Sequence, residues 1–514
     1  MATSRWPPLL LTLATLLALG RVCTFGFTNV EDEGLITTNP NLNPPTLAGL
    51  RNHWAEPHIG LYIPVTYSAW WVLARLGQTS TPDEFGATLN PWLFHGANLA
   101  LHLAASLFVL ALLRRLRLRD GPALIGAMLF ALHPVQVEAV AWTTGMKDVL
   151  CGALAMAALY AYLVALQPNV DDRAGGGANL AGETAKRCGP PLRAGVYVVA
   201  TICFALAMLA KPAAVVLPVM AAAIDVLLLK RPWRRVVATV LPWLALAVPV
   251  LVVTRLVQPA ADVASSPLWA RPLIAADALA FYLWKLVWPF NLTMAYSRSP
   301  HAVTHSGAIR WTWLVPAGVA VLVAVARRRW LVAAALLFVA GLLPVLGLTK
   351  FTFQQFSTVA DRYLYLSMLG VALAVAHVAA RHWSNRLVRA ACAVALVLLG
   401  ARSFAQAGTW SNALTLYRHA VRAAPESSLA HGNLSAVLLE AGRAAEAAPH
   451  AARAVQLAPH RPILRVNYAL ILDALGRYAE EAEQLDALMR LHPSPGTARR
   501  LEEVRAKMAA KVTE

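Results

Sequence analysis

Long apolar runs, separated by short segments rich in arginine, make up residues 1–405 of the chain. Most of these runs are long enough for a helix to cross the roughly 30 Å hydrocarbon core of a bilayer. Short cytoplasmic loops carry an excess of Lys and Arg, so the arginine clusters at 114–119, 230–235 and 327–329 indicate which ends lie inside. With a cytoplasmic N-terminus, the pattern predicts eleven spans and an external C-terminus. The spans are about 8–26, 91–113, 122–133, 149–167, 194–210, 213–229, 236–257, 311–326, 330–348, 363–380 and 387–405.

One apolar stretch, 272–290, does not fit as a crossing. If it crossed, the arginines at 327–329 would lie outside, against the charge rule. The stretch also contains Asp277 and Lys285. We therefore interpret it as an interfacial or re-entrant segment.

A second such stretch, 61–76, lies within the predicted external loop 27–90. It is rich in Trp and Tyr, which favour the depth of the lipid headgroups, and it ends in Arg75. The pattern predicts an amphipathic helix at the membrane surface. A Gly-rich linker that carries Lys186 and Arg187 is predicted to be cytoplasmic and flexible.

The tail beyond residue 405 has a different pattern, with many alanines and a repeat. Pro425, Pro459 and Pro493 are spaced by 34 residues, as are Asn433 and Asn467. A period of 34 is typical of tetratricopeptide (TPR) repeats, in which each repeat is a helix pair and the pairs stack into a solenoid. The sequence therefore predicts an all-α protein, with a polytopic membrane bundle over 1–405 and a TPR domain over 406–514. Complete repeats are expected over about 426–459 and 460–493, with a half repeat before them and a capping helix after them.

Composition agrees with this division. Hydrophobic residues are 58% of the chain and charged residues only 14%, which excludes an ordinary soluble protein and indicates an integral, multi-pass membrane protein. The net charge of +18 would suggest nucleic-acid binding in a soluble protein. Here the arginines lie between apolar runs, so we expect membrane lipid and no nucleic acid as a partner. The five cysteines imply no disulfide framework.

The charge rule alone places a set of polar residues on the external side. They are Glu31, Asp32 and Glu33 (the acidic triplet), His133, Glu138, Lys147, Asp148, Lys211, Asp361, Arg362 and Tyr363. A carboxylate can serve as general base, and basic groups can bind phosphate. Together at a membrane surface, these residues suit transfer of a group from a lipid phosphate to a hydroxyl acceptor. No spacing of His, Asp and Glu matches a metal cage, so we expect no metal.

Each candidate also has a purely structural interpretation. The acidic triplet could be solvated beside a helix end, and Lys147 and Asp148 could form a local ion pair. His133 could be a helix-end histidine with its hydrogen bonds satisfied, and Arg362 could anchor a span by reaching to the interface.

The repeats carry a pair of candidates of their own, Asn433 and Asn467. In a stacked solenoid these two positions line up along the concave surface. Their amides could bind the backbone of a peptide acceptor or bond to the neighbouring repeat.

The sequence resembles the transmembrane and TPR-containing O-mannosyltransferases and their bacterial relatives, over nearly the whole chain. The motifs that carry the resemblance are Phe27–Leu42, His133–Trp142, Lys147–Asp148, Lys211–Pro212, Phe281–Pro289 and Asp361–Gly370. The family usually has Asp-Asp where this chain has Glu31-Asp32, and the bacterial pattern has Glu-Arg where this chain has Gly145-Met146.

The resemblance implies a GT-C class glycosyltransferase that uses a polyprenyl-phosphate sugar, with mannose as the expected sugar. Asp32, with Glu31 beside it, would be the base that activates a hydroxyl of a protein Ser or Thr. Arg362, with Lys211 and Lys147, would hold the donor phosphate, and the remaining candidates would support the site. The resemblance also implies a bacterial inner-membrane location, with the repeats outside the cytoplasm to bind a protein or peptide acceptor.

Two other functions compete with this one. A non-enzymatic scaffold that presents TPR repeats at a membrane would need far fewer spans. A transporter would need ionisable groups within spans, where Asp225 is the one clear candidate, and an aspartate there is expected to be paired or close to the inner end.

Overall fold

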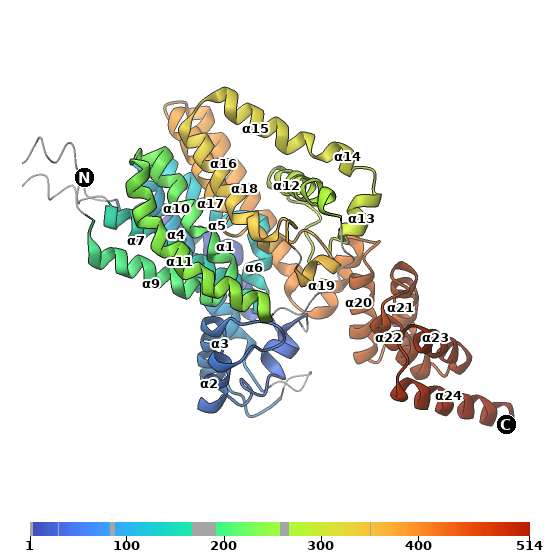
Figure 1. Ribbon diagram of the computed structural model, residues 1–514. Coiled ribbons are helices and arrows are strands. Elements are labelled where there is room, and N and C mark those ends of the chain that lie inside the picture. Colours follow the sequence, from blue (N-terminus) through green and yellow to red (C-terminus); the bar gives the residue numbers. More distant parts are fainter. Residues whose placement is uncertain are drawn as a thin grey trace, which may run out of the picture.

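The computed structural model describes residues 4–28, 30–82, 88–166, 192–257, 267–349 and 351–513. The predicted linker around Lys186 and Arg187 lies outside these ranges. Helices supply the regular structure of the described residues, where only two isolated β-bridges occur, so the predicted all-α fold is confirmed (Figure 1).

Among the described residues, seven helical segments are long and apolar enough to cross a bilayer, and one bent pair makes an eighth. The chain is therefore a multi-pass membrane protein. The seven segments are Trp6–Thr24, Pro91–Arg115, Thr143–Leu166, Pro212–Leu229, Trp233–Val257, Ile309–Ala326 and Arg386–Trp410. They contain α1 (Trp6–Leu19), α4 (Pro91–Arg115), α7 (Met146–Leu166), α10 (Leu217–Ala223), α11 (Trp233–Val257), α14 (Ile309–Thr312), α15 (Leu314–Ala326) and α18 (Arg386–Ala407).

Three shorter apolar helical segments coincide with the remaining predicted spans, although the count of eleven crossings stays a prediction. They contain α9 (Ala194–Ala210), α16 (Arg329–Leu342) and α17 (Met368–Arg381). The stretch that we interpret as interfacial forms α12 (Arg271–Val287), and the short helix α13 (Pro300–His305) follows it.

The bent pair lies where the sequence predicts a break. Helix α5 (Asp120–Leu132) ends before His133, and the chain turns by 48° before α6 (Val137–Ala141). The residue before a proline disfavours the helical conformation, so His133 is extended and Pro134 begins a new turn. The segment after the break is buried against the bundle, which brings Glu138 into the protein interior.

The predicted external loop has a core of its own. It contains a π-helical turn (Glu33–Thr37), α2 (Leu47–Ala55) and α3 (Pro64–Leu76), the last over the stretch predicted to be amphipathic. Buried side chains of this loop, including Phe27, Ile36 and Trp70, pack with Phe94 of α4 and Met146 of α7. This packing holds the acidic triplet beside the N-terminus of α7.

Six helices form a C-terminal arm that extends away from the bundle (Figure 1). They are α19 (Ala413–Ala423), α20 (Ser428–Glu440), α21 (Ala444–Leu457), α22 (Pro462–Ala474), α23 (Tyr478–Leu491) and α24 (Pro495–Thr513). Each helix packs on the next along the chain. Gly442 and Gly476 are 34 residues apart, and each ends the turn after the first helix of a pair. Both have a positive φ (71° and 65°), a backbone conformation that glycine adopts without steric cost. The helix boundaries agree with the two predicted repeats, and their assignment to the TPR class stays a prediction.

Candidate active site

Three ion pairs lie together where the external loop, α6, α7 and the segments around residues 211 and 362 converge. They are Lys147 with Glu31, Lys211 with Asp148, and Arg362 with Glu138. All six residues are predicted site residues, and each pair joins segments that are distant in sequence. The interpretation of Lys147 and Asp148 as a local ion pair is therefore wrong, since each binds a different partner.

Arg362 is the most enclosed of the three cations. Its side chain is 6% exposed, and its Nη1 donates to Glu138, which is 3% exposed. The backbone amides of Asp361 and Arg362 donate to the second oxygen of Glu138 at 3.0 and 3.4 Å. Burial opposes the charge and is the largest single effect, but Glu138, together with Tyr363, Glu31 and Asp148, outweighs it and raises the pKa of Arg362. The Arg362 side chain is thus held inside the protein by Glu138, which disfavours the anchoring interpretation.

Two aromatic rings connect the cations. The Arg362 guanidinium lies 5.2 Å from the ring centroid of Trp142 and 5.0 Å from that of Tyr363. The Lys147 ammonium lies 4.9 Å from the Trp142 centroid, and the Lys211 ammonium 5.7 Å from the Tyr363 centroid. The rings therefore hold three like charges close together, each with its own carboxylate.

The two leading carboxylates of the acidic triplet have different surroundings. Asp32 is fully buried and accepts hydrogen bonds from the backbone and hydroxyl of Thr28 (both 2.9 Å) and from the backbone of Thr144 (3.2 Å). Glu31 keeps 39% of its side chain exposed and accepts from Lys147 at 2.6 Å. Burial raises the pKa of Asp32, and the three donors counteract this only in part. For Glu31, burial also raises the pKa, but Lys147 and Arg362 outweigh it and hold the pKa below its usual value. Neither residue is freely solvated; Glu33 is exposed.

Next to Lys211 and Arg362 is a pocket with both polar and apolar lining residues. Its empty space is about 350 Å³, counting space open to solvent. The polar lining residues are Asp148, Lys211, Arg362, Tyr363 and Tyr365. The other lining residues are Cys151, Ala213, Gly341, Pro344, Val345 and Leu366. We call this the mixed pocket.

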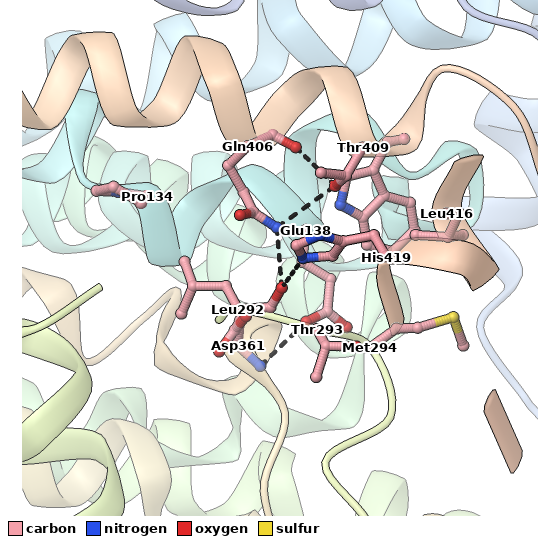
Figure 2. Close-up of a pocket in the computed structure, with 11 residues that line it drawn as sticks. Pro134, Glu138, Leu292, Thr293, Met294, Asp361, Gln406, Thr409, Leu416 and His419 are labelled. Atoms are coloured by element: carbon pink, nitrogen blue, oxygen red, sulfur yellow. Dashed lines mark hydrogen bonds between the residues drawn. The ribbon is translucent and has the colours of Figure 1, made fainter. Parts of the chain in front are cut away.

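A second pocket, of about 240 Å³ counting space open to solvent, is lined by Glu138 and by residues of the bundle and the arm (Figure 2). Asp361 borders it and accepts from the Tyr296 hydroxyl at 2.7 Å. Burial, with Glu138 nearby, raises the pKa of Asp361 well above its usual value. Gln406 of α18 and His419 of α19 both bond to the carbonyl of Leu292, at 3.0 and 2.9 Å, so this pocket belongs to the joint that fixes the arm.

Two predicted sites have structural contacts instead of contacts with the cations. His133 accepts from the Val135 backbone at 3.3 Å and lies 3.1 Å from the Leu286 carbonyl, as expected of a satisfied helix-end histidine. Asn433 is close enough to the Tyr417 hydroxyl in the preceding helix to counteract in part the rise that burial causes in the pKa of Tyr417, which favours the structural interpretation at that position. Asn467 is half-buried.

Asp225, inside a span, accepts from the Tyr162 hydroxyl and from Arg231, both at 2.7 Å, so it is paired as expected.

No pattern in the sequence indicates a role for Trp142, Tyr296 or Trp410. Trp142 lies within the motif His133–Trp142, but nothing in the motif shows that its ring contacts two cations. Its ring also stacks on Trp410, at the start of the arm, with centroids 6.0 Å apart. Among the described residues, no group of three or more His, Cys, Asp or Glu side chains is arranged to hold a metal ion.

The fold and the site thus define a multi-pass membrane protein with a buried, charge-paired cluster beside an amphipathic pocket. No family model matches the chain. Curated relatives include the protein O-mannosyl-transferase TMTC1 of Homo sapiens and that of Mus musculus. Each is 30% identical over 158 residues, which is 30% of this chain and 17% or 16% of the relative. The chain therefore spans only about a sixth of the length of these relatives, and part of it is similar to membrane glycosyltransferases.

Proposed function

We propose that this protein is a membrane glycosyltransferase that moves a sugar from a polyprenyl-phosphate carrier to a hydroxyl acceptor. The observation that carries the proposal is the mixed pocket, whose two cations, Lys211 and Arg362, also act on the charge of Glu31. A lipid-linked sugar phosphate has an anionic group and an apolar chain, so it needs cationic and apolar groups at one place. The names of the similar proteins support mannose as the sugar and protein as the acceptor.

Arg362 and Lys211 bind the phosphate in this proposal. The Arg362 fork has five N–H donors, and the bond to Glu138 uses Nη1, so other donors of the planar group can bind phosphate oxygens. Glu138 and the aromatic rings fix the plane of the guanidinium before the donor arrives. Fixed cations stabilise the negative charge that develops on the leaving phosphate, without reorganisation during the reaction.

Glu31 is the base in this proposal, and Asp32 fixes the loop that carries it. A base must reach the proton of the acceptor hydroxyl, and Asp32 is enclosed by its three donors. Glu31 is partly exposed and close to the cations. This exchanges the roles that the family motif implies for the two residues.

The reaction is a single displacement. The acceptor oxygen bonds to the anomeric carbon, its proton passes to Glu31, and the bond from that carbon to the phosphate oxygen breaks. The leaving group is the polyprenyl phosphate, held by Arg362 and Lys211. One displacement inverts the configuration at the anomeric carbon.

The arm presents the acceptor protein in this proposal, outside the cytoplasm and, as the resemblance implies, at a bacterial inner membrane. Two contacts hold it next to the site. The Arg461 guanidinium lies 4.1 Å from the ring centroid of Phe356, six residues before Arg362, and the Ser297 hydroxyl donates to the Glu426 carbonyl at 2.9 Å. An acceptor bound by the arm would therefore be close to Glu31.

Mass spectrometry of extracytoplasmic proteins tests the proposal. Cells that make the chain should carry a hexose on Ser or Thr residues that cells without it lack. Cells that make the Glu31→Gln variant at the same level should lack this hexose as well. Identical modification in all three strains would overturn the proposal and leave the membrane scaffold as the better account.

A further inference from the structure

The carboxylate of Asp148 has one oxygen in use and one without a partner. Asp148 lies in the first turn of α7 and is 5% exposed. Its Oδ1 accepts from the Lys211 ammonium, while its Oδ2 has no hydrogen-bond partner among the described residues. Buried carboxylate oxygens in folded proteins are almost always hydrogen-bonded, so this atom calls for an explanation.

Asp148 lines the mixed pocket, and the two cations there differ from it in kind. Lys211 and Arg362 can only donate hydrogen bonds. The Tyr365 hydroxyl is already engaged by His102 Nδ1 at 2.8 Å. The pocket therefore combines two cations with a carboxylate oxygen that can only accept, and its ligand should carry both an anionic group and a hydrogen-bond donor.

A sugar phosphate has this combination, because hydroxyl groups that donate lie a few bonds from the phosphate. We propose that Asp148 Oδ2 accepts a hydrogen bond from a hydroxyl of the donor sugar, so that Asp148 determines which sugar is transferred. This rests on the proposed function.

The consequence is selectivity against one deoxy sugar. A site built to bond a hydroxyl rejects an analogue without it, because the buried acceptor is then left unpaired. Sugars that lack other hydroxyls should be transferred nearly as well as the parent.

The test uses the full chain in liposomes with polyprenyl-phosphate mannose, glucose and galactose. For the hexose that is transferred, each monodeoxy analogue is then compared by kcat/KM. For one analogue we expect a loss of about 10- to 100-fold, the usual range for a hydrogen bond to a charged group. Asp148→Asn keeps the shape, and its amide oxygen can keep the bond to Lys211, so an N–H₂ group, which cannot accept a hydrogen bond, takes the place of Oδ2. The ratio of parent to that analogue should therefore fall close to one.

Lys211→Gln is the matched control, because it weakens phosphate binding but keeps the Asp148 carboxylate. It should raise KM for every donor and preserve the ratio. Analogues that all react within about threefold of the parent would overturn the inference alone, as would an Asp148→Asn enzyme that keeps the wild-type ratio. If the wild-type chain transfers none of the three hexoses, the proposed function fails, and the inference fails with it.

Discussion

Replacing Arg362 by lysine tests whether the planar guanidinium, and not only its charge, holds the donor phosphate. Lysine keeps the positive charge and can still pair with Glu138, so the buried carboxylate is not left alone. It cannot span two phosphate oxygens while bonded to Glu138, and it loses stacking on rings whose centroids lie 4.5–5.2 Å from the guanidinium.

The magnitude follows from the contacts that are lost. One charge-assisted hydrogen bond to the donor contributes about 1.5–3 kcal/mol. A tenfold change in rate corresponds to about 1.4 kcal/mol, so kcat/KM for the donor should fall by about 10- to 100-fold. Because the buried ion pair is retained, the melting temperature in detergent should change little. Transfer is measured in liposomes with a radiolabelled polyprenyl-phosphate sugar, and donor affinity by competition with polyprenyl phosphate.

Arg298 offers a matched control. It also pairs with a buried aspartate, Asp277, and its guanidinium lies 5.3 Å from the Phe281 ring centroid, but it is outside the three ion pairs. Arg298→Lys should keep near wild-type transfer. An Arg362→Lys enzyme with unchanged turnover and donor affinity would refute the reasoning, and so would equal losses in the two variants.

Three further predictions concern the base and the topology. Glu31→Gln should lower transfer by about 100-fold or more, the usual scale for loss of a general base, and should leave donor binding unchanged. Asp32→Asn should mainly lower the melting temperature. The reverse result would return the role of base to Asp32. Lys147→Gln removes a group that lowers the pKa of Glu31, so that pKa rises. Activity needs the carboxylate, which exists above its pKa, so the acid limb of the kcat/KM profile should move to higher pH; an unmoved limb would separate Glu31 from catalysis. A reporter active only outside the cytoplasm should work when fused after Glu514 and fail after Arg329, and a signal after Arg329 would mean that α12 crosses the membrane.

The architecture could be predicted because it depends on patterns that are local in sequence. Apolar runs of helical length, the break at His133 and the period of 34 residues each reflect the backbone geometry of one segment. The charge rule then placed Glu31, Lys147, Lys211 and Arg362 on one side of the membrane, and in the structure these residues share one cluster.

The pairing within the cluster could not be predicted, because it depends on how distant segments pack. Nothing near Lys147 in sequence shows that it binds Glu31 while the adjacent Asp148 binds Lys211. The burial of Asp32 has the same origin, since Thr144, one of its donors, belongs to a segment more than a hundred residues away. The contact of Trp142 with two cations likewise arises only from packing.

The most direct test of the central claim follows the sugar and its carrier together. Purified protein in liposomes is given polyprenyl phosphate carrying labelled mannose and a peptide containing Ser and Thr. The account predicts that label appears on the peptide in step with release of polyprenyl phosphate, with the anomeric configuration inverted relative to the donor, and that Arg362→Gln abolishes both. Label that stays on the lipid, or a product that keeps the configuration of the donor, would contradict it.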